Sequence, residues 1–202
     1  MRTPPRRLAR LAWHARVAGG LACACASSAC AESAKERARA DMAVLRAETT
    51  PAHLQARGDA AAVSGDFTRA EQYYVAALRA GGDEGVLAKR LLIVCVTDGR
   101  YPAAASHAED YLRRHPGDTD LRYALATVYI GLGDPAAARA ALEQVIGERP
   151  DDADAHYALA TVLREQGEDL RGADLHFREY IRLDPKGPFA EAARASLLRS
   201  VP

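Results

Sequence analysis

The sequence predicts an all-α protein made of repeated helix pairs, and three observations point to this class. The hexapeptide Tyr-Ala-Leu-Ala-Thr-Val occurs at 123–128 and again at 157–162, so its two copies start 34 residues apart. Glycine-centred turns recur with the same period, at Gly65, Gly99, Gly133 and Gly167. No segment alternates apolar and polar residues as a half-buried strand does. A fixed period of this length is typical of solenoids, in which each repeat packs on its neighbours.

The residues within one period fit two antiparallel helices. Segment 122–131 has apolar residues around most of its helical circumference, so it must be covered on more than one side. Its partner, 135–147, is rich in alanine and begins with Pro135, which suits a first helical turn. Between the two helices, Gly133 can adopt the left-handed conformation that ends a helix, and Asp134 can cap the next one.

The period divides residues 51–187 into four units, with segments of different character on either side. The expected unit boundaries are 51–84, 85–118, 119–152 and 153–187. The fourth unit carries one extra residue near Asp169. Residues 32–50 are prone to form a helix, and two roles remain open for it: an N-terminal cap or a solvated tether.

Residues 188–202 are expected to form a capping helix and a tail. The helix opens at Pro188, and one of its faces holds Phe189, Ala192, Ala193, Ser196 and Leu197. A solenoid needs such a cap because the apolar face of its last repeat would otherwise be exposed to water.

The pattern resembles the tetratricopeptide repeat, a helix-turn-helix unit of this period. The third unit carries the resemblance best, with Ala126 where the two helices cross, Ala138 after the turn and Pro150 at the end. The site of the family's signature tryptophan departs from the pattern, since it holds Leu54, Ala88, Arg122 and His156. The resemblance implies a right-handed α-solenoid of about four repeats plus a C-terminal capping helix.

The resemblance also implies a concave groove, lined by the first helix of each repeat, that binds a protein or peptide. Eight residues map to groove positions: Gln55, Asp59, Lys89, Ile93, Tyr123, Thr127, Tyr157 and Thr161. Two interpretations of the tyrosines remain open, groove contact and packing between adjacent first helices. A clamp for carboxylate tails is not expected, because only Lys89 matches it, and Ile93 and Asp120 replace the asparagine and lysine it requires.

Residues 1–31 have the outline of a secretory signal. They contain five arginines and no acid, then a weakly apolar stretch, then an Ala-x-Ala site at 29–31. The apolar stretch is too short to span a membrane as a mature helix. Cys23 and Cys30 lie in imperfect versions of a bacterial lipidation motif, which makes them candidates for a lipid anchor. The alternatives are a disordered basic leader and a mis-assigned start codon.

The charge balance disfavours two classes of partner, and the cysteine content bears on the role of Cys95. The chain has 27 basic and 27 acidic residues, and loss of the five leader arginines leaves 22 basic against 27 acidic, a net charge of −5. This balance disfavours nucleic acid and anionic membranes as partners. Removal of the leader would leave Cys95 as the only cysteine, expected to be a small buried apolar residue.

No catalytic motif is present, so we expect no enzyme activity, no cofactor and no metal site. The histidines lack metalloprotease spacing, and phosphate-binding loops and nucleophile elbows are absent. The acids Asp151, Asp152 and Asp154 are expected to flank a helix N-terminus, where the dipole favours them.

The sequence therefore predicts a non-enzymatic adaptor that binds a partner segment in its groove, within a bacterial envelope complex. The expected location is the periplasm or the outer membrane. Two alternatives remain open: a cytoplasmic scaffold or secretion-type chaperone that keeps its N-terminus, and an accessory subunit of an envelope enzyme. The sequence names neither the partner nor the oligomeric state.

Overall fold

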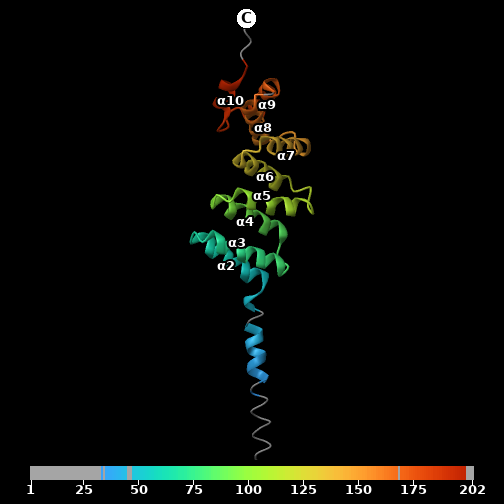
Figure 1. Cartoon of the computed structure of the whole chain (residues 1–202). Coiled ribbons are helices and arrows are strands. Elements are labelled where there is room, and N and C mark those ends of the chain that lie inside the picture. Colours follow the sequence, from blue (N-terminus) through green and yellow to red (C-terminus); the bar gives the residue numbers. More distant parts are fainter. Residues whose placement is uncertain (1–32, 34, 45–46, 168, 199–202) are drawn as a thin grey trace, which may run out of the picture. The chain divides into compact units, whose positions relative to one another are not determined.

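The computed structural model describes residues 33, 35–44, 47–167 and 169–198, and within these ranges it contains helices and no strand (Figure 1). The predicted all-α class is confirmed over those residues. The chain divides into two compact units, Met1–Thr50 and Pro51–Pro202. In the first unit, residues 35–44 are helical. The fold described below is that of the second unit.

The second unit consists of helix pairs that follow one another along the chain, with a short helix at the end. The pairs are α2 (Pro51–Val63) with α3 (Phe67–Arg79), α4 (Glu84–Thr97) with α5 (Tyr101–Leu112), α6 (Thr119–Leu132) with α7 (Pro135–Glu148), and α8 (Ala153–Gln166) with α9 (Leu170–Leu183). The short helix is α10 (Ala190–Ser196). Each helix packs mainly on the next one in sequence, as in a solenoid (Figure 1). We call α2, α4, α6 and α8 the first helices and α3, α5, α7 and α9 the second helices.

The turn inside each pair has the construction that the sequence predicts. All four turn glycines have φ between 72° and 80°, a conformation that residues with a Cβ rarely adopt. Gly133 ends α6 in this way, and Asp134 Oδ1 accepts a hydrogen bond from the backbone N–H of Ala137 at 3.0 Å. The second pair is an exception, because Arg100 gives α5 no side-chain cap. The acids at the start of α8 also behave as expected, since Asp152 caps that helix.

Buried apolar side chains of the described residues form two clusters, and α6 contributes to both. Helices α2 and α3 pack tightly at Gly58, where an added Cβ would come 2.4 Å from Cε1 of Tyr74. Tyr74 is fully buried there. The absence of a side chain on Gly58 is therefore what lets a large tyrosine fill the space between α2 and α3.

Helix α10 differs from the expected capping helix in where it begins and in what it buries. It starts at Ala190 rather than Pro188, and its buried residues are Ala190 and Ala193, while Ala192 is exposed. The reason lies in the segment before it. The backbone N–H of Phe189 donates a hydrogen bond to Tyr180 Oη at 3.1 Å, which holds the chain against α9 before the helix starts.

The predicted leader, 1–31, lies outside the described residues, and so do Cys23 and Cys30. In the part of the chain that the structure describes, no helix combines the length and the apolar character needed to cross a membrane.

Candidate functional site

All eight residues predicted for the groove lie on the first helices, two on each of α2, α4, α6 and α8. We call the surface that carries them the first-helix face. Lys89, Ile93 and Thr127 are exposed, and the other five residues are half-buried. The face is therefore accessible chiefly at its middle, on α4 and α6.

At the α2 end of this face, Asp59 is engaged inside the protein. It accepts a hydrogen bond from Tyr74 Oη at 2.8 Å and forms an ion pair with Arg90 of α4. Burial raises the pKa of the Tyr74 hydroxyl, and the hydrogen bond to Asp59 raises it further. Asp59 thus joins two helix pairs through its Oδ1 atom.

On α4, two exposed side chains extend from the first-helix face. Ile93 is 59% exposed although it is a large apolar residue. Lys89 Nζ lies 4.0 Å from Asp118 Oδ2, a loose ion pair in which the Lys89 side chain is 49% exposed and the Asp118 side chain 18%. A pair this long with an exposed lysine contributes less than about 1 kcal/mol, so Lys89 can exchange this partner for another at little cost.

On α6, Tyr123 packs with one part of its ring against the second core cluster. Burial raises the pKa of its hydroxyl, and the negative charges of Asp154 and Asp152 at the start of α8 raise it further. Thr127, one turn on, donates its hydroxyl hydrogen to the Ala124 carbonyl at 2.7 Å. A hydroxyl that donates to its own helix keeps lone pairs that can accept from a partner.

On α8, Tyr157 lies in a group of aromatic rings. Its ring stacks on Phe189 with centroids 4.4 Å apart and an interplanar angle of 14°. The rings of Tyr180 and Phe177 lie 5.3 Å and 5.8 Å away. Thr161 donates its hydroxyl hydrogen to the Tyr157 carbonyl at 3.0 Å. Tyr157 is therefore occupied by the C-terminal segment of its own chain, whereas Tyr123 has no ring stacked on it among the described residues.

Exposed apolar side chains are unevenly distributed between first and second helices. Large exposed apolar residues on first helices are Val63, Val86, Ile93, Ile130 and Leu132. Among the second helices, whose residues are all described, α3, α5 and α7 expose none, whereas α9 exposes Leu170 and Leu175. An open pocket of about 290 Å³ also lies between α6 and α8, bordered by Ile130, Pro135 and Val162 among others. No motif in the sequence indicates this pocket, although Ile130 and Pro135 flank the Gly133 turn.

One group of metal-ligating side chains in the described residues was also missed. Glu71, Cys95 and His107 offer a carboxylate oxygen, a sulfur and a ring nitrogen that all lie within 4.8 Å of one another. Burial raises the pKa of the Cys95 thiol to about 11, and the charge of Glu71 contributes. These residues come from three helices, so no local spacing in the sequence could have marked them.

Two family models described as tetratricopeptide repeat match the chain, one over residues 55–119 and the other over 96–162. No curated protein gives a significant sequence match.

Solved structures show the same fold at low sequence identity. YrrB, described as a tetratricopeptide repeat protein with an unusual peptide-binding site, is 22% identical with a TM-score of 0.64, covering 79% of this chain and 83% of its own. MamA from Desulfovibrio magneticus is 20% identical with a TM-score of 0.60, covering 70% and 79%. A tetratricopeptide repeat protein from Parabacteroides merdae is 19% identical with a TM-score of 0.65, covering 72% and 58%. Together with the two family matches, which span more than half of the chain, they show that residues 55–162 belong to the tetratricopeptide repeat family.

Proposed function

We propose that the second unit is a binding module that holds a segment of a partner protein on its first-helix face. The observation that carries this proposal is the exposure of large apolar residues on the first helices α2, α4 and α6, which the fully described second helices of the same three pairs, α3, α5 and α7, lack. In the fourth pair the exposed residues Leu170 and Leu175 lie on α9 instead. Exposed apolar side chains gathered on neighbouring first helices favour an interaction surface. The likeness to YrrB shows the fold alone, so peptide binding is a proposal for this chain.

The middle of the face supplies complementary contacts for such a segment. Ile93 and Ile130 would be buried by apolar side chains of the partner, at about 25 cal/mol for each Å² removed from water. The free part of the Tyr123 ring offers stacking, and Thr127 offers an acceptor for a backbone N–H. The face provides binding and orientation, and the function we propose for it is binding without catalysis.

The proposal is tested by charging the centre of the face. Ile93→Asp removes an apolar contact and puts an unpaired carboxylate in its place, so we expect the affinity for a purified partner to fall about tenfold or more. Gln144→Asp on the exposed surface of α7 is the matched control and should leave the affinity unchanged. Both sites are exposed, so the free energy of unfolding of each variant should lie within about 0.5 kcal/mol of that of the parent protein. Equal partner affinity for a folded Ile93→Asp variant would reject the proposal.

We further propose that the protein acts in a bacterial envelope complex after export. The basic leader and the Ala-x-Ala site at 29–31 support this location. Cell fractionation combined with mass spectrometry of the N-terminus tests it. A start at Glu32 supports soluble export, an acylated Cys23 or Cys30 supports an anchored form, and an intact Met1 in the cytosol would favour the cytoplasmic scaffold instead.

A further inference from the structure

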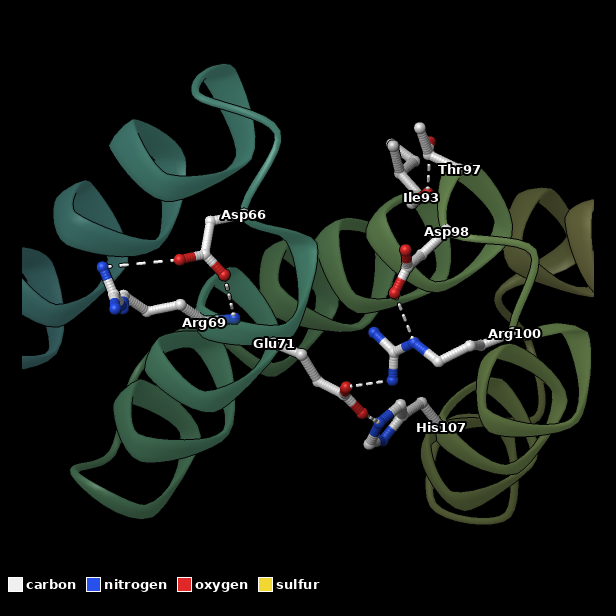
Figure 2. Close-up of polar contacts among 8 residues, drawn as sticks. All are labelled: Asp66, Arg69, Glu71, Ile93, Thr97, Asp98, Arg100 and His107. Carbon is white, nitrogen blue, oxygen red and sulfur yellow. Dashed lines mark hydrogen bonds and ion pairs between the residues drawn. The ribbon is translucent and has the colours of Figure 1, made fainter.

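A polar cluster inside the solenoid joins the first two helix pairs. Glu71 comes from α3, Cys95 from α4 and His107 from α5. Figure 2 shows Glu71 between Arg100 and the His107 ring. Cys95 is fully buried, and the side chains of Glu71 and His107 are only 19% and 25% exposed. Three donors of different chemistry thus converge at one buried junction.

The carboxylate of Glu71 is held in a fixed orientation. Its Oε2 accepts a hydrogen bond from Arg100, whose Nε in turn donates to Asp98 Oδ2 at 2.7 Å (Figure 2). Its other oxygen, Oε1, lies 2.8 Å from His107 Nε2. Arg100 holds Oε2 of Glu71, and this leaves Oε1 directed toward the other two donors. Hydrogen bonds from neighbouring residues commonly orient metal ligands in this way.

The charge of the cluster is suited to a divalent cation. Arg100 is flanked by two carboxylates, those of Glu71 and Asp98, so these three groups carry a net charge of −1. With Cys95 as a thiolate the cluster would carry −2, which a divalent ion neutralises. Buried charge without such compensation is costly. Histidine binds metals as a neutral imidazole, so a ligand of this type adds no charge to the cluster.

The side chains of His107 and Glu71 are partly exposed, so two of the three donors are in contact with solvent. His107 borders an open furrow of about 280 Å³ between α3, α4 and α5, together with Leu91, Asp110 and Tyr111 among others. One period on, the positions of the three donors hold Ala105, Tyr129 and Ala141, so the next junction has no equivalent set. The cluster therefore belongs to this junction and is not a general feature of the repeat.

We propose that Glu71, Cys95 and His107 bind one Zn²⁺ ion, through Glu71 Oε1, Cys95 Sγ and His107 Nε2, with a water molecule as fourth ligand. Sulfur, imidazole and carboxylate are the donors that zinc takes in proteins. In a tetrahedral site the nitrogen and oxygen ligands lie about 3.3 Å apart, against 2.8 Å between His107 Nε2 and Glu71 Oε1 here, so the hydrogen bond between these two atoms opens by about 0.5 Å when the ion binds. The imidazole then carries its proton on Nδ1, which frees Nε2 for the ion, and the Cys95 thiol gives its proton to solvent as the zinc–sulfur bond forms. The ion ties α3 to α4 and α5 and stabilises the contact between the first two helix pairs.

The test uses the untagged full chain with Cys23, Cys25 and Cys30 changed to serine, which leaves Cys95 as its only thiol. The protein is stripped with a chelator and titrated with Co²⁺, whose bond to a thiolate gives an intense charge-transfer band in the near ultraviolet. We expect this band to saturate at one ion per chain and to disappear on addition of Zn²⁺. Zinc should also raise the midpoint of thermal unfolding.

Ligand variants and a matched control decide the outcome. Cys95→Ser should abolish the band. Loss of an outer-shell partner costs roughly 10- to 100-fold in metal affinity. His107→Gln removes a direct ligand, so it should weaken zinc binding by at least that factor. His115→Gln is the control, because His115 Nε2 lies 3.0 Å from Glu84 Oε2 in an exposed carboxylate–histidine pair. It should leave binding unchanged. Absence of the band in the parent protein, or zinc binding that survives both ligand variants with intact helical circular dichroism, would overturn the proposal.

Discussion

The two copies of the repeated hexapeptide have the same six residues but different surroundings. In the fourth pair, the ring of Tyr157 stacks on Phe189 and lies near Tyr180 and Phe177. In the third pair, Tyr123 meets the start of α8, where Asp152 and Asp154 lie close enough to raise its pKa, after the larger effect of burial. The element that follows each copy therefore decides whether another aromatic ring stacks on its tyrosine.

The residue before each tyrosine extends the comparison. Arg122 and His156 stand one period apart, both are buried, and each bonds the carbonyl of the proline six residues earlier. Arg122 also pairs with Glu148 at 2.9 Å, whereas His156 Nδ1 lies 2.9 Å from His176 Nδ1. The proline carbonyl is thus bonded by a guanidinium group in the third pair and by an imidazole ring in the fourth.

Truncating the two tyrosines should give the largest difference. Tyr157→Ala removes a ring from an aromatic cluster, so we expect a loss of about 3 kcal/mol in the free energy of unfolding. Tyr123→Ala should cost about half as much, because no aromatic ring stacks on it. Urea denaturation of both variants measures the difference. Equal losses would mean that the C-terminal segment does not distinguish the two copies.

Removing the ring of Phe189, which stacks on Tyr157, should have a smaller effect on the free energy of unfolding. We expect Phe189→Ala to lower the free energy of unfolding by about 1 kcal/mol, since Phe189 is itself exposed and loses mainly its contact with Tyr157. A double-mutant cycle with Tyr157→Ala should give a coupling energy of similar size. Additive losses would show that the two rings do not support each other.

The smallest effect should be a dependence of the free energy of unfolding on pH. Burial and the neighbouring His156 lower the pKa of His176 below its ordinary value, and they outweigh the opposing charges of Asp169, Glu143 and Glu179. The unfolded chain then binds a proton more readily than the folded one, so the stabilising contribution is complete above about pH 6.5 and decreases as the pH falls toward the folded pKa.

Hydrogen exchange can locate this effect. Between pH 7 and pH 5, after correction for the intrinsic pH dependence of exchange, protection of α8 and α9 should decrease more than protection of α6 and α7, which contain no histidine. His176→Gln should remove the difference between the two pairs. A uniform loss of protection, unaffected by that substitution, would contradict this assignment.

The parts of the molecule that the sequence predicts are those set by local or periodic rules. The Gly133 turn and the Asp134 cap follow from backbone conformation and a side chain three residues from its donor, so both were predictable. The contact of Phe189 with Tyr157 was not, because it depends on how a segment outside the repeat folds back. The meeting of Glu71, Cys95 and His107 was also missed, since it depends on the packing of three helices.

Site-specific photo-crosslinking tests the central claim, that the first-helix face holds the partner, most directly. A benzophenone amino acid is placed at Thr127 on α6 or at Gln144 on α7, both of which are exposed, and the protein is irradiated in its native cells. We expect the probe at Thr127 to form adducts with one defined segment of a partner protein. The probe at Gln144 should form no adduct with that segment. Adducts with the same segment from Gln144, and none from Thr127, would contradict the account.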